Sequence, residues 1–147
     1  MKRDVLTEGR RWFQQGEYEL SVARNLADNL FHAAACFFAH QSAEKYLKAL
    51  LYAQGERRVV GHSINDLCDQ CADYFEKFAE LKGQVRQLDR YYIPTRYPNG
   101  LPGGVPAEMY DETDSAAALE LVALIRAAVV VGVPELNSQN DEDHRRE

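Results

Sequence analysis

The chain has 147 residues, of which 46% are hydrophobic and 27% are charged. A chain of this length can bury the core of one domain without metal or disulfide support, and its composition is typical of a folded protein. The formal net charge of -6 argues against an extended nucleic-acid interface, because neutralising many phosphates needs a basic surface, but it is compatible with a small basic pocket.

Hydrophobic periodicity predicts two long helices in the first third of the chain. The first is expected over residues 4–28, with its apolar side including Trp12 and Leu30 and a weak point or break near Gly16. The second is expected over residues 30–54, where Ala and Leu are abundant, and Gly55 stops it.

Three further helices follow. Ser63 is a good N-cap for the segment "INDLCDQCADYF", and a fourth helix is expected over residues 76–92, before Pro94 ends it. After a long loop rich in Pro and Gly, the fifth helix is expected to start at Asp114 or Ser115. No segment alternates with the period of a strand. The predicted fold class is therefore all-α, an up-and-down antiparallel bundle of about five helices.

Residues 1–134 are expected to form this helical domain, and residues 135–147 a disordered polar tail. The apolar segment 116–133 is interrupted by Glu120 and Arg126 and is shorter than the roughly 20 clean residues of a membrane span. It is predicted to be a helix buried in the bundle or at a subunit interface, with no membrane partner. The charged start "MKRDVLTEGRRWF" is unlike a signal peptide, so a cytoplasmic location with reduced cysteines is expected.

The second helix carries a polar ridge opposite its apolar side. Its apolar side is predicted from Ala35, Ala39, Ala43, Tyr46, Leu47 and Leu50. Gln41, Lys45, Lys48 and Tyr52 line up on the other side, and Glu44 beside them is placed to pair with Lys48. Such a ridge is usually a solvated face, but an amide, two ammonium groups and an aromatic ring could also hold a phosphate and a base.

The stretch "DRYYIPTRYPNG" at residues 89–100 concentrates rings and guanidinium groups where the fourth helix ends. Arg96 could cap the last carbonyl groups of that helix, since a helix C-terminus favours a cation, while Tyr97 packs and the prolines stiffen the turn. Alternatively, Arg96 could bind a phosphate through two hydrogen bonds, with Tyr97 as a stacking or hydroxyl partner and the polar ridge as the facing wall.

The segments "AACFFAHQSAEKYLKALLYAQG", "HSINDLC", "LDRYYIPTRYPNG" and "YDETDSAAALELVALI" together resemble the HEPN domain family from about residue 10 to residue 131. The resemblance implies a bundle of about five helices that dimerises, often beside a minimal nucleotidyltransferase partner. It also implies nucleotide binding without a cofactor, at Arg96, Tyr97 and the ridge residues. Many family members are metal-independent endoribonucleases, some of them toxins of toxin–antitoxin pairs.

The ribonuclease branch resembles a pattern of Arg, four to six residues and then His, and here no histidine follows Arg96 at that spacing. Cleavage through a ribose 2′-hydroxyl needs one group that moves protons and one that stabilises the phosphate charge, and Arg96 could supply only the second. His62 and His40 are the remaining candidates for the first, although both are expected to be structural. A noncatalytic dimerisation module using the 116–133 segment is the third hypothesis.

The pair "CDQC" at residues 68–71 has the spacing of zinc and redox sites. A single pair on a helix, without a second pair of ligands, is more typical of two small packed side chains. The sequence therefore predicts no metal site. "YPNGLPGG" lacks the Lys and Ser or Thr of a phosphate loop. It could be a flexible connection, but it is longer than a usual helix-to-helix loop, and such long loops are often lids or binding segments.

Overall fold

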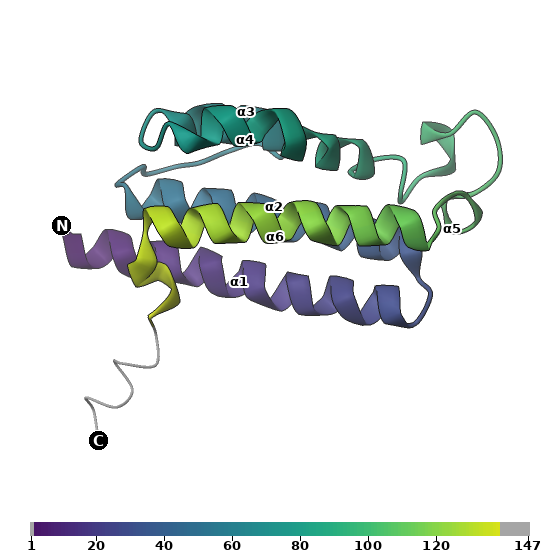
Figure 1. Cartoon of the computed structure of the whole chain (residues 1–147), viewed down its shortest axis with the longest axis horizontal. Helices are drawn as coiled ribbons and strands as arrows, with labels where there is room; N and C mark the ends of the chain where they lie inside the picture. The colour runs from purple at the N-terminus through teal and green to yellow at the C-terminus, as the bar shows by residue number, and fades with distance from the viewer. Residues whose placement is uncertain (1, 139–147) are drawn as a thin grey trace, which may run out of the picture.

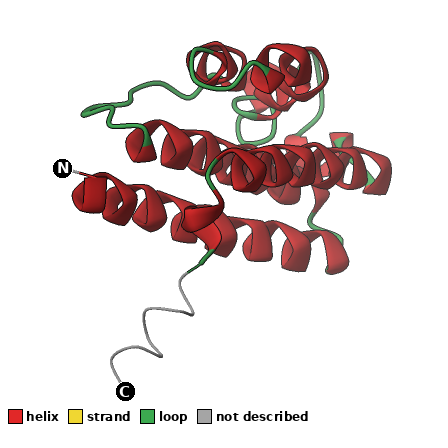
Figure 2. Cartoon of the chain, turned by 60° about the vertical axis from the view of Figure 1, so that its left-hand side comes forward, coloured by secondary structure: helices red, strands yellow, loops and turns green. Residues whose placement is uncertain are grey.

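In the computed structural model, residues 2–138 are described and contain helices but no strand. The α-helices are α1 (Lys2–Asp28), α2 (His32–Ala53), α3 (Ile64–Ala72), α4 (Lys77–Val85), α5 (Pro106–Met109) and α6 (Glu112–Gly132), and the 3₁₀ helices are η1 (Arg86–Tyr91), η2 (Pro98–Gly100) and η3 (Pro134–Asn137). Figures 1 and 2 show three layers, with α3 and α4 on one side, α2 and α6 in the middle and α1 on the other side. The predicted all-α helical bundle is confirmed.

Helix α2 is the central helix and is buried on most of its circumference. The six residues predicted to face the core are all fully buried. Glu44 and Lys48 are also buried, with exposed fractions of 3% and 5%, so the expected solvated ridge is wrong at these two positions. The reason is that α1 packs along this side of α2, which periodicity within one helix cannot reveal.

Helix α1 continues unbroken through Gly16, which serves close packing rather than a kink. A Cβ atom at Gly16 would lie 3.0 Å from the ring of Tyr46, so any larger residue here would have to displace that ring by a few tenths of an ångström. The buried side of α1 contains Phe13, Leu20 and Ala23. Leu30, expected on that side, is 76% exposed, because it lies in the α1–α2 turn with φ of 68°.

Residues 54–63 return along α2, so α3 starts over the middle of α2 rather than at its end (Figure 1). The predicted cap is confirmed, since the Ser63 hydroxyl accepts a hydrogen bond from the Asp66 backbone nitrogen at 3.1 Å. The predicted fourth helix is α-helical only to Val85 and continues as η1. The last helix starts earlier than expected, at Glu112, because Asp111 caps it.

The C-terminal boundary of the packed domain lies beyond residue 134. Residues 134–137 form η3, and Leu136 is buried at 1% exposure beside Gly9 of α1. The Arg10 side chain donates to the Glu135 carbonyl oxygen at 3.0 Å. Four residues of the predicted tail, 135–138, are therefore part of the described fold, and residues 139–147 lie outside it.

Helix α6 packs against α2 but leaves an apolar face uncovered. After Glu112 and Thr113 in its first turn, the exposed residues are Ala116, Ala117, Glu120, Ala123, Leu124, Ala127 and Val131. By length and composition alone this helix could cross a membrane, and 33% of its most apolar stretch is buried in the bundle. The core helix of a bundle meets the same criterion, and Arg126 of α6 is bonded to Glu17 of α1.

Candidate functional site

Arg96 lies just after η1 and stacks on three aromatic rings. Its guanidinium carbon is 4.3 Å from the ring centre of Phe37, 4.8 Å from that of Tyr92 and 5.1 Å from that of Tyr97. Its Nε donates to the Tyr92 carbonyl oxygen at 3.0 Å, which is the helix-end contact that the sequence suggested. Within residues 2–138, its two terminal nitrogens have no hydrogen-bond or ion-pair partner. Capping therefore uses one nitrogen and leaves the forked end of the guanidinium available.

A cavity of about 360 Å³ opens beside Arg96. Its walls come from the α1–α2 turn with the start of α2, from the segment after η1, and from the start of α5: residues 30–34, 95, 96, 98 and 105–107. No side chain caps the start of α2 within the described chain, so its first backbone N–H groups add partial positive charge to this wall. The long Pro/Gly loop thus contributes a wall of the cavity through α5.

Glu44 organises a second cluster in the middle of α2. Its carboxylate lies 2.6 Å from His62 Nδ1, 3.6 Å from Lys48 Nζ and 3.7 Å from Lys45 Nζ. The Glu44 and Lys48 side chains are only 4% and 7% exposed, whereas His62 is 56% exposed. Lys45 also bonds Glu19 of α1 at 3.2 Å. The two lysines are therefore neutralised by carboxylates.

His62 connects the Glu44 cluster to Arg96 through Tyr92. The His62 ring stacks on the Tyr92 ring with centres 5.0 Å apart and planes 18° apart, and Arg96 contacts the same Tyr92 ring. An ionised carboxylate only accepts hydrogen bonds, so His62 Nδ1 must carry a proton toward Glu44. In the neutral ring this leaves Nε2 as a lone-pair acceptor on an exposed side chain.

Asp89 of η1 holds the start of α3, and with it His62, in place. Its carboxylate accepts hydrogen bonds from the backbone nitrogens of Ile64 at 2.7 Å and Asn65 at 3.1 Å, and from the Ser63 hydroxyl at 3.2 Å. The Nε2 atom of the fully buried His40 is 3.2 Å away. Burial raises the pKa of Asp89, but the hydrogen bonds from His40 and the two backbone nitrogens outweigh it, so that the pKa lies below its ordinary value.

The predicted polar ridge faces α1 rather than Arg96. Tyr52 stacks on Trp12 of α1 with ring centres 5.1 Å apart, and Lys48 Nζ lies 5.6 Å from the Trp12 ring centre. The Gln41 side-chain oxygen is buried, without a hydrogen-bond partner in the described chain. The structure thus packs Lys45, Lys48 and Tyr52 against α1. Glu44 lies beside the two lysines, and Arg96 and Tyr97 form another cluster that reaches Glu44 only through Tyr92 and His62.

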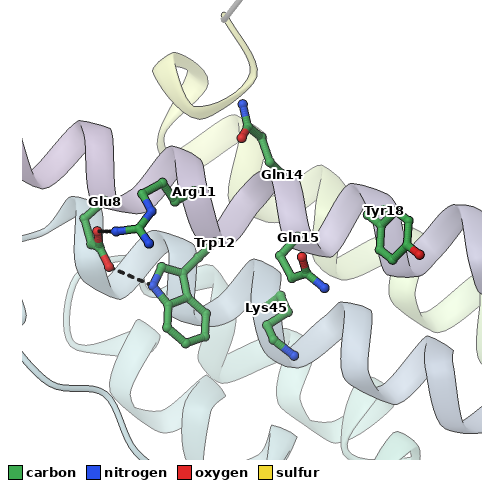
Figure 3. A pocket seen from close by; sticks show the side chains of 7 residues that line it. All are labelled: Glu8, Arg11, Trp12, Gln14, Gln15, Tyr18 and Lys45. Carbon is green, nitrogen blue, oxygen red and sulfur yellow. Dashed lines mark hydrogen bonds and ion pairs between the residues drawn. The ribbon is translucent and has the colours of Figure 1, made fainter.

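A larger cavity, of about 610 Å³, lies over α1 and is an open surface (Figure 3). Of the residues predicted to bind a nucleotide, Lys45 is present in the described lining of this cavity. Glu8 accepts hydrogen bonds from Arg11 at 2.9 Å and from Trp12 at 3.1 Å, so the charges in this cavity are largely paired.

Cys68 and Cys71 are both fully buried, and burial raises the pKa of the Cys68 thiol to about 12 and that of Cys71 further. Thiols of this kind are unreactive. Among the described residues, no group of three His, Cys, Asp or Glu side chains is arranged to hold a metal ion.

The sequence did not indicate Phe37, Tyr92, Asp89 or the Glu44–His62 pair as parts of the site. Tyr92 and Asp89 do lie inside the singled-out stretch 89–100, so the concentration of rings and charges there was the usable signal. His62 lies in the loop before α3, and its partner Glu44 lies 18 residues earlier on α2, so no local pattern indicates this contact.

Comparison with known proteins agrees with this arrangement of helices. The profile of the HEPN domain family matches residues 10–133, and the chain belongs to this family. TT1696 from Thermus thermophilus is 37% identical, with a TM-score of 0.74, over 85% of this chain and 98% of that one. ST0689, an archaeal HEPN homologue, is 34% identical, with a TM-score of 0.67, over 82% of this chain and 93% of that one. Among curated proteins none matches.

Proposed function

We propose that this HEPN protein binds a nucleotide or the phosphate of an RNA end at Arg96. The observation that carries the proposal is a guanidinium group held on three rings by stacking and by one hydrogen bond, with its forked end unpaired within the described chain. Such a fork matches two phosphate oxygens, and its fixed position lowers the entropy cost of binding. The exposed Tyr97 ring beside it is placed to contact the ligand.

In this proposal Lys45 and Lys48 support the site rather than bind the phosphate. Their charges are already matched by Glu44 and Glu19, and Glu44 in turn holds His62 next to Tyr92. The phosphate is therefore bound by the Arg96 cluster. The residues of the predicted ridge affect this cluster only indirectly, because Glu44 holds His62 against Tyr92.

The proposed working form is a homodimer, with or without a minimal nucleotidyltransferase partner. The uncovered apolar face of α6 supports this part, because exposed apolar patches often mark protein interfaces. Light scattering of the purified protein at micromolar concentration tests the dimer, and a monomer mass would argue against it.

Substituting Arg96 is expected to separate binding from folding. Arg96→Gln should weaken binding of nucleoside monophosphates by about tenfold or more, because it removes a charge-assisted contact worth roughly 1.5–3 kcal/mol. The midpoint of thermal unfolding should change little, since Arg96 is exposed. Calorimetric titration and a thermal melt measure the two effects.

The matched control is Arg90→Gln, which changes an exposed arginine of η1. Unchanged binding with a large loss of stability would assign Arg96 a capping role only.

Metal-independent RNA cleavage is a second candidate function, and the Glu44–His62 hydrogen bond favours it. His62 Nε2 could take the proton of a ribose 2′-hydroxyl as that oxygen bonds to phosphorus and the bond to the 5′ oxygen breaks. The proton then returns to the leaving 5′ oxygen, and Arg96 balances the charge on the phosphate. His62 would thus supply the proton-transferring group that is otherwise missing, since no histidine follows Arg96 at the spacing of the ribonuclease pattern.

Labelled RNA incubated with the protein in EDTA tests this activity. His62→Gln is expected to reduce cleavage by about 10²-fold or more, the usual contribution of a general base. Gln70→Ala is the control, because Gln70 is an exposed residue of α3 that lies outside both the Glu44 cluster and the lining of the Arg96 cavity. If the wild type does not cleave RNA, or if His62→Gln cleaves it as fast as the wild type, RNA cleavage through His62 is ruled out as a function.

A further inference from the structure

The cavity beside Arg96 is larger than a phosphate group requires. At about 360 Å³ it falls within the range of small-ligand sites, which is roughly 300–1,000 Å³. Among the described residues that line it, Arg96 is the only one with a permanent charge. A ligand that fills it must therefore combine an anionic group with a larger apolar or flat part.

The lining offers surfaces for stacking, and its side chains provide few groups for hydrogen bonding. Phe31 is 62% exposed, and within the described chain its ring contacts no other aromatic ring and no cation. Pro98 and Pro106 contribute further apolar surface. A base that stacks on an aromatic side chain gains roughly 1–3 kcal/mol, which corresponds to about 5- to 150-fold in affinity.

The polar side chains of the lining already have partners. The Thr95 hydroxyl donates to the Tyr91 carbonyl oxygen. His32 Nδ1 is hydrogen-bonded to the Ser115 hydroxyl at 2.9 Å, and the same hydroxyl lies 3.2 Å from the Glu112 carbonyl oxygen. In the part of the lining that the structure describes, the side-chain groups left for hydrogen bonding are His32 Nε2 and the remaining lone pairs of the buried Thr95 hydroxyl. A single hydrogen bond discriminates between bases by about tenfold at most.

We propose that this cavity holds the base of a nucleotide whose phosphate is bound by Arg96, and that it holds the base by stacking on Phe31 and by shape. The inference rests on the proposed phosphate site and assigns the remaining part of the ligand. It makes the protein a binder of single nucleotides or unpaired RNA ends with little preference for one base. Few side chains of the lining can bond to the edges of a base, and the uncapped backbone N–H groups at the start of α2 can donate to acceptors that every base carries.

Calorimetric titration with AMP, UMP and ribose 5-phosphate tests the inference. AMP and UMP should each bind at least about fivefold more tightly than ribose 5-phosphate and within about tenfold of each other. Phe31→Ala, and Ala107→Phe, which fills the cavity from an exposed position, should lower the affinity for AMP to that for ribose 5-phosphate. Binding of ribose 5-phosphate should stay unchanged in both variants. Tyr18→Ala, an exposed ring on α1, is the matched control.

The outcomes separate this inference from the proposed function. If AMP binds no more tightly than ribose 5-phosphate, or if neither cavity variant weakens AMP binding, the base does not occupy the cavity and Arg96 remains a phosphate ligand. A difference above about tenfold between AMP and UMP would overturn the weak base preference that the inference assigns to this cavity. If no ligand binds, or Arg96→Gln binds all of them as the wild type does, the phosphate site itself is wrong.

Discussion

Asp89→Ala is expected to lower the free energy of unfolding by about 1.5–5 kcal/mol. The variant removes the acceptor of two backbone N–H groups at the start of α3, a loss comparable to that of a helix cap at about 0.5–2 kcal/mol. It also leaves the fully buried His40 without the partner of its Nε2, which costs roughly 1–3 kcal/mol more. Urea unfolding of the variant and the wild type at neutral pH measures the difference.

Asp69→Ala is the control for this variant, because Asp69 lies on α3 but only bonds Lys82 at the surface, where an ion pair contributes little. If Asp89→Ala is no less stable than this control, the carboxylate does not hold α3. The variant should also alter any RNA or nucleotide binding that involves His62. Asp89 fixes the first turn of α3, and His62 immediately precedes Ser63, the N-cap of that helix.

The stability difference should depend on pH in one direction. The folded protein lowers the pKa of Asp89 below its ordinary value of 3.8, so the contribution of Asp89 is fully present above that value and is lost as the pH falls through the folded pKa. The gap between wild type and Asp89→Ala should therefore narrow below about pH 4. Glu17 also has a lowered pKa: burial raises it, but the hydrogen bonds from Arg126 and Tyr46 lower it by more. Because Glu17 is present in both proteins, its contribution to the pH dependence cancels when their stabilities are compared. A gap that widens on acidification would contradict this account.

Glu44→Ala is expected to cost about 3–5 kcal/mol, the range for removing one partner of a buried ion pair. Lys48 is 7% exposed and has Glu44 as its ion-pair partner, so the variant leaves its ammonium group buried without a counter-charge. Lys45 is less affected, because it keeps Glu19. Chemical unfolding at neutral pH gives the magnitude.

Two further variants identify the cause of the Glu44 effect. Glu120→Ala removes an exposed carboxylate from α6 and should be nearly neutral. Glu44→Leu combined with Lys48→Met should recover most of the loss, because it replaces the buried pair with apolar side chains of similar size. If the double variant is as unstable as Glu44→Ala, an uncompensated Lys48 charge is not the reason.

The candidate site was predictable only in its Arg96 part. Arg96 and Tyr97 stand in a short stretch with an unusual density of rings and charges, and a helix C-terminus favours a cation, so both signals are local. The residues of the ridge do share one side of α2, as their spacing predicts, but spacing does not reveal their environment. Lys48 and Tyr52 contact Trp12, which lies on another helix and far from them in the sequence.

Local rules were sufficient wherever the cause lies within a few residues. The helical class, the apolar side of α2 and the Ser63 cap follow from the spacing of apolar residues and from the backbone groups at a helix start, and all three are present. Local rules were insufficient at helix ends. Asp114, which the sequence suggests as the start of the last helix, occupies the third position of a capping box that Asp111 begins.

Taken alone, the amino-acid sequence determined that this chain is a HEPN-type helical bundle and that Arg96 is its foremost phosphate-binding candidate. Only the tertiary structure decided what surrounds that residue. The return of residues 54–63 over α2 brings His62 onto Glu44, and the course of η1 brings Asp89 to the start of α3. These contacts join groups 18 and 25 residues apart, and they exist because helices bury their apolar sides against one another, which is a property of the whole fold rather than of any segment.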